Sequence, residues 1–180
     1  MLSETGLIHI YSGDGKGKTT AAFGLAVRFV AYGGKVAIFQ FLKDASSGES
    51  VFLKNLNLDS INIFASQKKL PFYWTANEEE KKEISEETQK LFDRAVQFAE
   101  NKNIELLILD EVLDVINNKL IDEKNVLEIC DLCKKNSIEL VITGRNPSEI
   151  LLQKCDYHSD IVLKKHPFYS GISARAGIEY

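Results

Sequence analysis

The sequence predicts an α/β domain with a mostly parallel central sheet of about six strands flanked by helices. Short apolar runs alternate with longer segments of helical periodicity along the 180 residues, which is typical of repeated strand-helix units. Two runs, 104–109 (IELLIL) and 138–143 (IELVIT), are almost continuously apolar, as in strands covered on both faces. Hydrophobic residues make up 44% of the chain and charged residues 27%, which suits a globular domain. We therefore expect residues 1–180 to form a single domain.

In the first half of the chain the pattern predicts three strands and one long helix. Residues 6–12 alternate in part and end in glycines, so we expect a strand there. A helix is expected over 18–32, because apolar side chains recur there at helical spacing: Ala22, Leu25, Ala26, Phe29 and Val30. The pair Gly33-Gly34 would end it. Strands are expected over 35–42 and 61–65.

The second half is expected to add two helices and three strands. An acidic start, Glu78–Glu80, suits the N-terminus of a helix over 77–101. A second helix is expected over 123–136. The two apolar runs already described supply two strands, and 160–163 is expected to be a short last strand.

Composition and charge exclude several classes of protein. The formal net charge is −4, which argues against a nucleic-acid binder held by a general basic field. No stretch approaches the roughly 20 apolar residues of a membrane span, and Met1–Thr5 lacks the features of a secretory signal. Three cysteines, an odd count, indicate a reducing cytoplasm. Cys130 and Cys133 lie in an expected helix, where buried thiols are favoured over the alternative of a metal-binding pair.

A glycine-rich segment, 12–20 (SGDGKGKTT), joins the first expected strand to the first expected helix, where a phosphate-binding P-loop must lie. The consensus G-x-x-x-x-G-K-[ST] is met at Gly17-Lys18-Thr19. It fails at its first position, Ser12, because the glycine comes one residue later at Gly13.

This segment has the chemistry of a triphosphate site. Three glycines let the backbone turn its amides toward one anion-binding concavity: Gly13, Gly15 and Gly17. The helix N-terminus adds partial positive charge. Lys18 would neutralise phosphate oxygens, Thr19 would bind Mg²⁺, and Lys16 is a further cation in the loop. The alternative is an ordinary glycine-rich turn with solvated lysines.

Two later strand ends complete the expected nucleotide site. Asp110-Glu111 follows the run 104–109 directly, and its carboxylates can reach Mg²⁺ directly or through water. Arg145 follows the run 138–143 and would point into the crevice where α/β sheets bind ligands. The alternatives are acids that cap a strand end and a surface arginine. Together these residues indicate a nucleoside triphosphate with Mg²⁺, but not what is done with it.

A longer set of residues resembles one family. The segment 13–43 (GDGKGKTTAAFGLAVRFVAYGGKVAIFQFLK) carries the loop, Arg28 and the QFLK sequence that ends at Lys43. Later blocks continue the match: 109–111, 141–145, 165–168, 171–172 and 174–180. Over about residues 6–180 the chain resembles the P-loop type of ATP:corrinoid adenosyltransferase, also called cob(I)alamin adenosyltransferase.

The resemblance implies a RecA-like P-loop domain that acts as a homodimer. Such a transferase moves the 5′-deoxyadenosyl group of ATP to cobalt(I) of a corrinoid, cobalamin or a precursor, and releases triphosphate. It would serve adenosylcobalamin biosynthesis or salvage, with a flavoprotein as the expected reductase. No nucleic acid or membrane partner is expected.

The resemblance also assigns roles to residues. ATP would be bound by Gly13, Asp14, Gly15, Lys16, Gly17, Lys18, Thr19, Thr20, Arg28 and Arg145. Lys18, Lys16 and Glu111 would act in catalysis, and Thr19 and Glu111 would bind Mg²⁺ or Mn²⁺. Phe72 and Trp74 would close under the corrin ring and exclude a lower axial ligand from cobalt. The alternative for these two aromatics is a hydrophobic staple before the following helix.

Two other functions stay open on the residues alone. A P-loop kinase or NTPase would release ADP or phosphate instead of triphosphate. A regulatory ATP-binding protein or corrinoid carrier would bind its ligands without turnover, although the retention of Lys18, Thr19 and Glu111 argues against an inactive site.

Overall fold

A six-stranded parallel sheet forms the centre of the protein in a computed structural model, which describes residues 5–44, 46–66, 71 and 73–178. The strands are β1 (Ile8–Ser12), β2 (Val36–Gln40), β3 (Ile61–Ala65), β4 (Leu106–Asp110), β5 (Glu139–Thr143) and β6 (Tyr157–Asp160). They lie in the order β3-β2-β4-β5-β1-β6, and each pairing is parallel. The expected α/β class is confirmed, with a sheet that is wholly rather than mostly parallel among the described residues.

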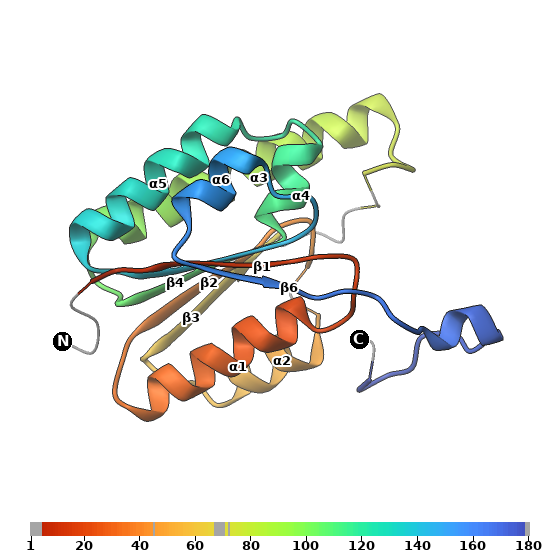
Figure 1. Cartoon of the computed structure of the whole chain (residues 1–180), viewed down its shortest axis with the longest axis horizontal. Coiled ribbons are helices and arrows are strands. Elements are labelled where there is room, and N and C mark those ends of the chain that lie inside the picture. Colours follow the sequence, from red (N-terminus) through yellow and green to blue (C-terminus); the bar gives the residue numbers. More distant parts are fainter. Residues whose placement is uncertain (1–4, 45, 67–70, 72, 179–180) are drawn as a thin grey trace.

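Helices cover both faces of the sheet. They are α1 (Lys18–Ala31), α2 (Gly48–Asn55), α3 (Glu78–Asn101), α4 (Val112–Asn117), α5 (Glu123–Asn136) and α6 (Glu149–Lys154), with a short 3-10 helix, η1 (Pro167–Ser170), near the C-terminus. Figure 1 shows α1 and α2 on one face and α3 to α6 on the other, while the chain after β6 runs outward from the sheet. Within the described part of the chain, no helix is long and apolar enough to span a membrane.

The central strands are apolar because helices cover both of their faces. Every residue of β2 and β4 is buried. One core cluster packs the sheet against α3 and α5, and a second packs it against α1. This arrangement explains the nearly continuous apolar runs, because a strand covered on two faces has no solvent-facing side for polar residues.

The long helices begin and end close to the expected residues. Gly33 has a positive φ of 89°, and its amide donates to the Val30 carbonyl, which ends α1 as the glycine pair predicts. At the start of α3, the Asn77 side chain accepts from the Glu80 amide and the Glu80 carboxylate accepts from the Asn77 amide, a reciprocal capping box. The bounds of α5 match the prediction.

The last strand was predicted wrongly. We expected it over 160–163, but β6 covers Tyr157–Asp160. All four of its residues are exposed, and β6 lies at an edge of the sheet, where it pairs with β1. Backbone pairing with β1 therefore defines β6, and the apolar pattern of the sequence does not predict its position. Three short helices, α2, α4 and α6, were also not predicted, because six to eight residues are too few to show a helical period clearly.

The helix α5 holds two cysteines in the core, as expected. Cys130 and Cys133 are both fully buried, and Cys155 is partly buried. Burial raises the pKa of Cys130 to about 12 and the pKa of Cys133 further, so neither thiol forms the reactive thiolate near neutral pH.

We expect a thiol reagent such as Ellman's reagent to modify Cys155 in the native protein well before Cys130 or Cys133. All three thiols should react at one rate in denaturant, which provides the control. Equal rates of labelling in the native protein, followed by mass spectrometry, would contradict this packing.

Candidate nucleotide and metal site

The phosphate loop lies between the carboxyl end of β1 and the N-terminus of α1, as expected. Gly13 and Gly17 have φ values of 110° and 117°, which favour glycine. A Cβ atom on Gly13 or on Gly15 would come within 2.5 Å of the Ile161 carbonyl oxygen. These two glycines are therefore required by the close approach of the segment after β6.

That segment is bonded directly to the loop. The Gly15 amide donates to the Ile161 carbonyl at 2.7 Å, and the Leu163 amide donates to Asp14 Oδ1 at 3.0 Å. The bond from Leu163 is the main reason that the pKa of Asp14 is lowered. We expected the amides of all three glycines to face one anion site. The Gly15 amide does not do so in this structure, because it donates to the Ile161 carbonyl.

Lys18 reaches back over the loop. Its Nζ donates to the Gly13 carbonyl at 2.7 Å and to the Gly15 carbonyl at 2.9 Å. Burial is the main cause that lowers its pKa, with a smaller effect from the positive charge of Arg145. A partly desolvated ammonium held at the loop is well placed to exchange carbonyl oxygens for phosphate oxygens.

Asp110 is the most completely bonded side chain of the site. Its carboxylate is fully buried at the end of β4. Oδ1 accepts from the hydroxyls of Thr19 at 3.0 Å and Thr143 at 2.7 Å. Oδ2 accepts from Gln40 Nε2 at 3.2 Å and Lys43 Nζ at 3.0 Å. Four donors from four elements or loops therefore hold one carboxylate in place.

Glu111 follows as the N-cap of α4 and has a left-handed backbone, with φ 66° and ψ 17°. This conformation is unfavourable for glutamate and is fixed by its amide, which donates to Thr143 Oγ1 at 2.9 Å. Its side chain is 30% exposed, with Oε1 at 2.9 Å from Lys43 Nζ. Burial raises the pKa of Glu111, and the positive charge of Lys43 opposes that rise.

Lys43 is a member of the site that the sequence analysis did not assign. It follows β2, which lies beside β4, so its side chain comes to the acidic strand end. Burial alone would lower its pKa, but the carboxylates of Asp110 and Glu111 outweigh burial and the pKa is raised. The sequence feature that could have indicated Lys43 is the QFLK segment, in which the buried Gln40 ends β2 and Lys43 follows three residues later.

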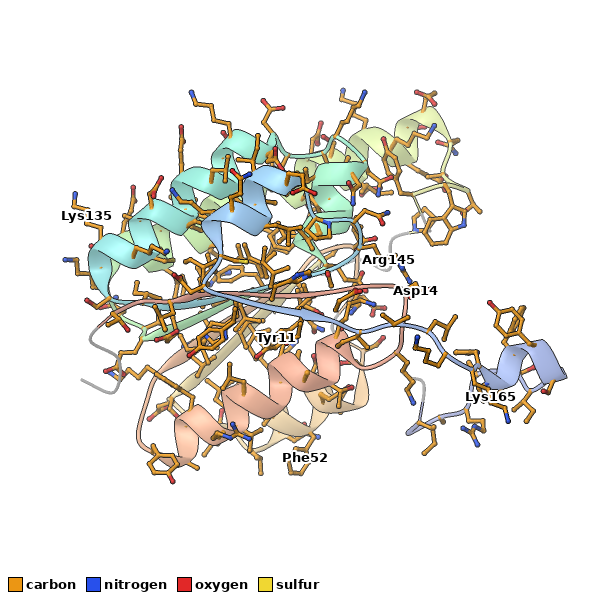
Figure 2. All side chains as sticks on the ribbon, viewed as in Figure 1. Tyr11, Asp14, Phe52, Lys135, Arg145 and Lys165 are labelled. Carbon is orange, nitrogen blue, oxygen red and sulfur yellow. The ribbon has the colours of Figure 1, made fainter. Side chains whose placement is uncertain are left out.

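Arg145 lies at the same edge of the sheet, and Figure 2 shows it near Asp14. Its amide donates to Asp114 Oδ2 at 3.2 Å and its Nη1 is 3.4 Å from Asp114 Oδ1. Asp114, in α4, is a second residue that sequence reasoning missed. The charge of Arg145 acts on Lys18 and Asp14, and its contact with the nucleotide stays a prediction.

Three other assigned residues remain, of which Arg28 lies far from this cluster. Arg28 is in the last turn of α1, about 15 Å along the helix axis from Lys18, where its charge acts on Tyr11. Thr20 Oγ1 donates to Glu49 Oε1 at 3.0 Å and so links α1 to α2. Lys16 is exposed in the loop.

The two aromatics assigned to the corrinoid are described only in part. Trp74 is 76% exposed in the turn before α3. The alternative of a hydrophobic staple is wrong for Trp74, because the position before the N-cap Asn77 is taken by the buried Ala76. Phe72 lies outside the described residues.

The arrangement combines a phosphate loop, its lysine and a cluster of oxygen atoms at one edge of a parallel sheet. β5 separates β1, which carries the loop, from β4, which carries the acids, so all three carboxyl ends contribute to the site. Among the described residues, no group of three or more His, Cys, Asp or Glu side chains could hold a metal by itself. This geometry fits a nucleoside triphosphate whose own oxygens would complete the coordination of Mg²⁺.

A comparison with known families decides what kind of P-loop protein this is. The family model for ATP:corrinoid adenosyltransferase BtuR/CobO/CobP matches residues 4–180. The chain belongs to this family. The family match therefore favours an adenosyltransferase over the kinase and NTPase alternatives.

Individual relatives agree with the ATP:corrinoid adenosyltransferase family. A corrinoid adenosyltransferase of Sinorhizobium sp. is 31% identical over 178 residues, with 98% of this chain and 81% of the relative covered. A corrinoid adenosyltransferase of Escherichia coli (strain K12) is 28% identical over 178 residues, covering 98% and 87%. Corrinoid adenosyltransferase CobA of Salmonella typhimurium is 27% identical over the same length, with the same coverage.

Proposed function

We propose that this protein transfers the 5′-deoxyadenosyl group of ATP to cobalt(I) of a corrinoid and releases triphosphate. The observation that carries the proposal is the match of the ATP:corrinoid adenosyltransferase family to residues 4–180. The site is consistent with it, since the phosphate loop and the oxygen cluster around Asp110 are both intact.

The reaction suits a site of fixed charges. Cobalt(I) is the nucleophile and attacks the 5′ carbon of ATP, so that a cobalt–carbon bond forms as the bond from the 5′ carbon to oxygen breaks. The electron pair of the broken bond stays on the triphosphate. No proton moves, so no general base is needed. Lys18 and Lys16 would stabilise the negative charge that grows on the leaving oxygen and along the triphosphate.

A magnesium ion, or manganese in its place, would be held by Thr19 and Glu111. The donor set fits such a cation, because the Thr19 hydroxyl and the Asp110 and Glu111 carboxylates all converge within 3.0 Å of one ammonium nitrogen, Lys43 Nζ. When bound, the ion would add positive charge beside the triphosphate. Asp110, with its four donors, would position Thr19.

The direct test is an anaerobic assay with MgATP and chemically reduced cobalamin. We expect a light-sensitive cobalt–carbon product, followed by absorbance, with one triphosphate released per adenosyl group. ADP or phosphate release without that product would instead indicate a kinase or NTPase. Tight binding of ATP and corrinoid with no product would indicate a carrier or sensor. The same assay with cobinamide and other precursors would determine the preferred corrinoid.

We propose that Trp74, with Phe72, covers the lower face of the corrin ring. The proposal is carried by the family match, and the 76% exposure of the Trp74 side chain leaves its ring accessible to a ligand. Without a lower axial ligand, cobalt(II) is easier to reduce, because the orbital that takes the electron is no longer raised by an axial donor.

We therefore expect Trp74→Ala to leave ATP affinity unchanged but to slow transfer at least about tenfold when cobalt(I) is generated in situ from cobalt(II). Transfer to cobalt(I) that is reduced beforehand should be nearly normal. Tyr32→Ala, at a similarly exposed aromatic (77%) after α1, is the matched control. Equal slowing with both forms of cobalt would contradict the axial-ligand role.

We also propose a homodimer served by a flavoprotein reductase in a reducing cytoplasm. Exposed apolar side chains of α2, Val51 and Phe52, offer surface for a second subunit, and the three cysteines are free. Sedimentation equilibrium tests the dimer, and a mass of one chain, 20.2 kDa, over the working concentrations would refute it.

A further inference from the structure

Lys43 occupies an unusual position in the site. Its Nζ lies 2.9 Å from Glu111 Oε1 and 3.0 Å from both Asp110 Oδ2 and Thr19 Oγ1. These three oxygens come from α1, the end of β4 and the N-cap of α4. The ammonium therefore sits at the point where the side chains that fit a divalent cation converge.

The contact with Thr19 is the most informative of the three. Lys43 donates a hydrogen bond to Thr19 Oγ1, while the Thr19 hydroxyl donates its own hydrogen to Asp110 Oδ1. The hydroxyl oxygen has two lone pairs, and Lys43 engages one of them at the point where the two carboxylates also converge. An ammonium and a divalent cation also repel each other, so the two compete for these oxygens.

The remaining contacts of Asp110 indicate that Lys43 is not needed to hold the acid in place. Thr19, Thr143 and Gln40 still donate to its carboxylate without Lys43. The side chain of Lys43 is 28% exposed, so it has room to swing away. Its backbone is anchored separately, because the Lys43 carbonyl accepts from the Ser66 amide at 3.3 Å.

We propose that Lys43 is an internal counter-ion that excludes divalent metal from the nucleotide-free enzyme and withdraws when the metal arrives with the triphosphate. This inference rests on the metal site proposed above and deepens it. In the free enzyme, the Lys43 ammonium offsets part of the negative charge of the Asp110 and Glu111 carboxylates. When MgATP enters, the metal takes over the oxygens, and Lys43 is released as a further cation near the triphosphate. Metal binding is thereby made conditional on nucleotide.

The test measures metal binding and not transfer. Mn²⁺ retained by the protein on ultrafiltration is quantified for the wild type, for Lys43→Gln and for Lys82→Gln, first without nucleotide. Lys82 is an exposed lysine of α3 far from the phosphate loop in sequence, so its variant controls for the loss of one charge. Glutamine keeps hydrogen-bond donors at position 43 but removes the positive charge.

We expect Lys43→Gln to bind Mn²⁺ without nucleotide at least about tenfold more tightly than the wild type or Lys82→Gln. Mg²⁺ alone should also raise the melting temperature of Lys43→Gln but not that of the wild type, a readout that confirms the variant is folded. Equal Mn²⁺ affinity in all three folded proteins would overturn the inference.

A second arm with ATP and no corrinoid separates this inference from the proposed function. We expect ATP to make the wild type retain Mn²⁺ together with the nucleotide. If it does, but Lys43→Gln gains nothing in the first arm, only the counter-ion role is lost. If ATP brings no Mn²⁺ to the wild type, the proposed metal site fails, and the role of Lys43 fails with it.

Discussion

Lys18→Ala is expected to reduce adenosyl transfer severely while leaving the fold intact. The Lys18 ammonium, held 2.7 and 2.9 Å from two loop carbonyls, is the cation best placed to follow the triphosphate as it takes up negative charge. Loss of one such group from a desolvated site costs about 10²–10³-fold in rate. The measurement is kcat/KM for ATP with chemically reduced cobalamin.

Two controls define the origin of that loss. Lys82→Ala removes a positive charge from the exposed face of α3 and should leave kcat/KM unchanged. Lys18→Arg keeps the charge but cannot place it at both carbonyls, so we expect an intermediate rate. Transfer by Lys18→Ala within about threefold of the wild type would mean that the triphosphate does not lie against this loop.

Asp110→Asn is expected to damage both stability and activity. The carboxylate accepts from four donors at once, and an amide in either orientation would place its own NH₂ group against two of them. With the group fully buried, we expect a loss of about 2–4 kcal/mol in the free energy of unfolding. Transfer should fall at least about 10²-fold, because one orientation of the amide removes the acceptor of Thr19 and the other removes the acceptor of Lys43.

Urea unfolding followed by circular dichroism measures the first effect, and the cobalamin assay at a temperature where the variant is folded measures the second. Glu111→Gln is the matched control for stability. Its side chain is 30% exposed, and its amide bond to Thr143 is untouched, so it should lose less than about 1 kcal/mol. Similar losses in the two variants would show that Asp110 is not the structural centre of the cluster.

The sequence predicts most reliably those parts of the fold that are buried on both sides. The runs that became β4 and β5 lie at the centre of the sheet, where the residues before the strand ends, 106–109 and 140–142, are all buried and apolar. The edge strand β6 was misplaced because none of its residues is buried, and its position depends on backbone pairing with β1. The short helix α2 depends on its Ser47 cap and on the hydrogen bond from Thr20 to Glu49. Neither contact is visible in the hydrophobic periodicity of the sequence.

The site residues that belong to a local sequence motif could be predicted. Those that come together only because two strands are neighbours in the sheet could not. The loop, Lys18 and the pair Asp110-Glu111 follow from local spacing. The role of Lys43 does not follow from local spacing. Lys43 contacts Asp110 only because β2 lies beside β4, and the spacing of motifs does not reveal the order of the strands in the sheet. Asp114 was missed for a similar reason, since its partner Arg145 comes from the far end of β5.

The order in which the chain is made has a consequence for this site. Of the six described strands, β1 is synthesised before the others, yet its two neighbours in the sheet, β5 and β6, are synthesised after the rest. The bond from Leu163 to Asp14 spans 149 residues of sequence. On a ribosome the phosphate loop therefore emerges early but waits for almost the whole chain before its brace at Ile161 is in place. A nascent chain that lacks β5, β6 and Ile161 would carry the nucleotide motif without the neighbours that shape it, so we expect ATP binding only once this segment has been made.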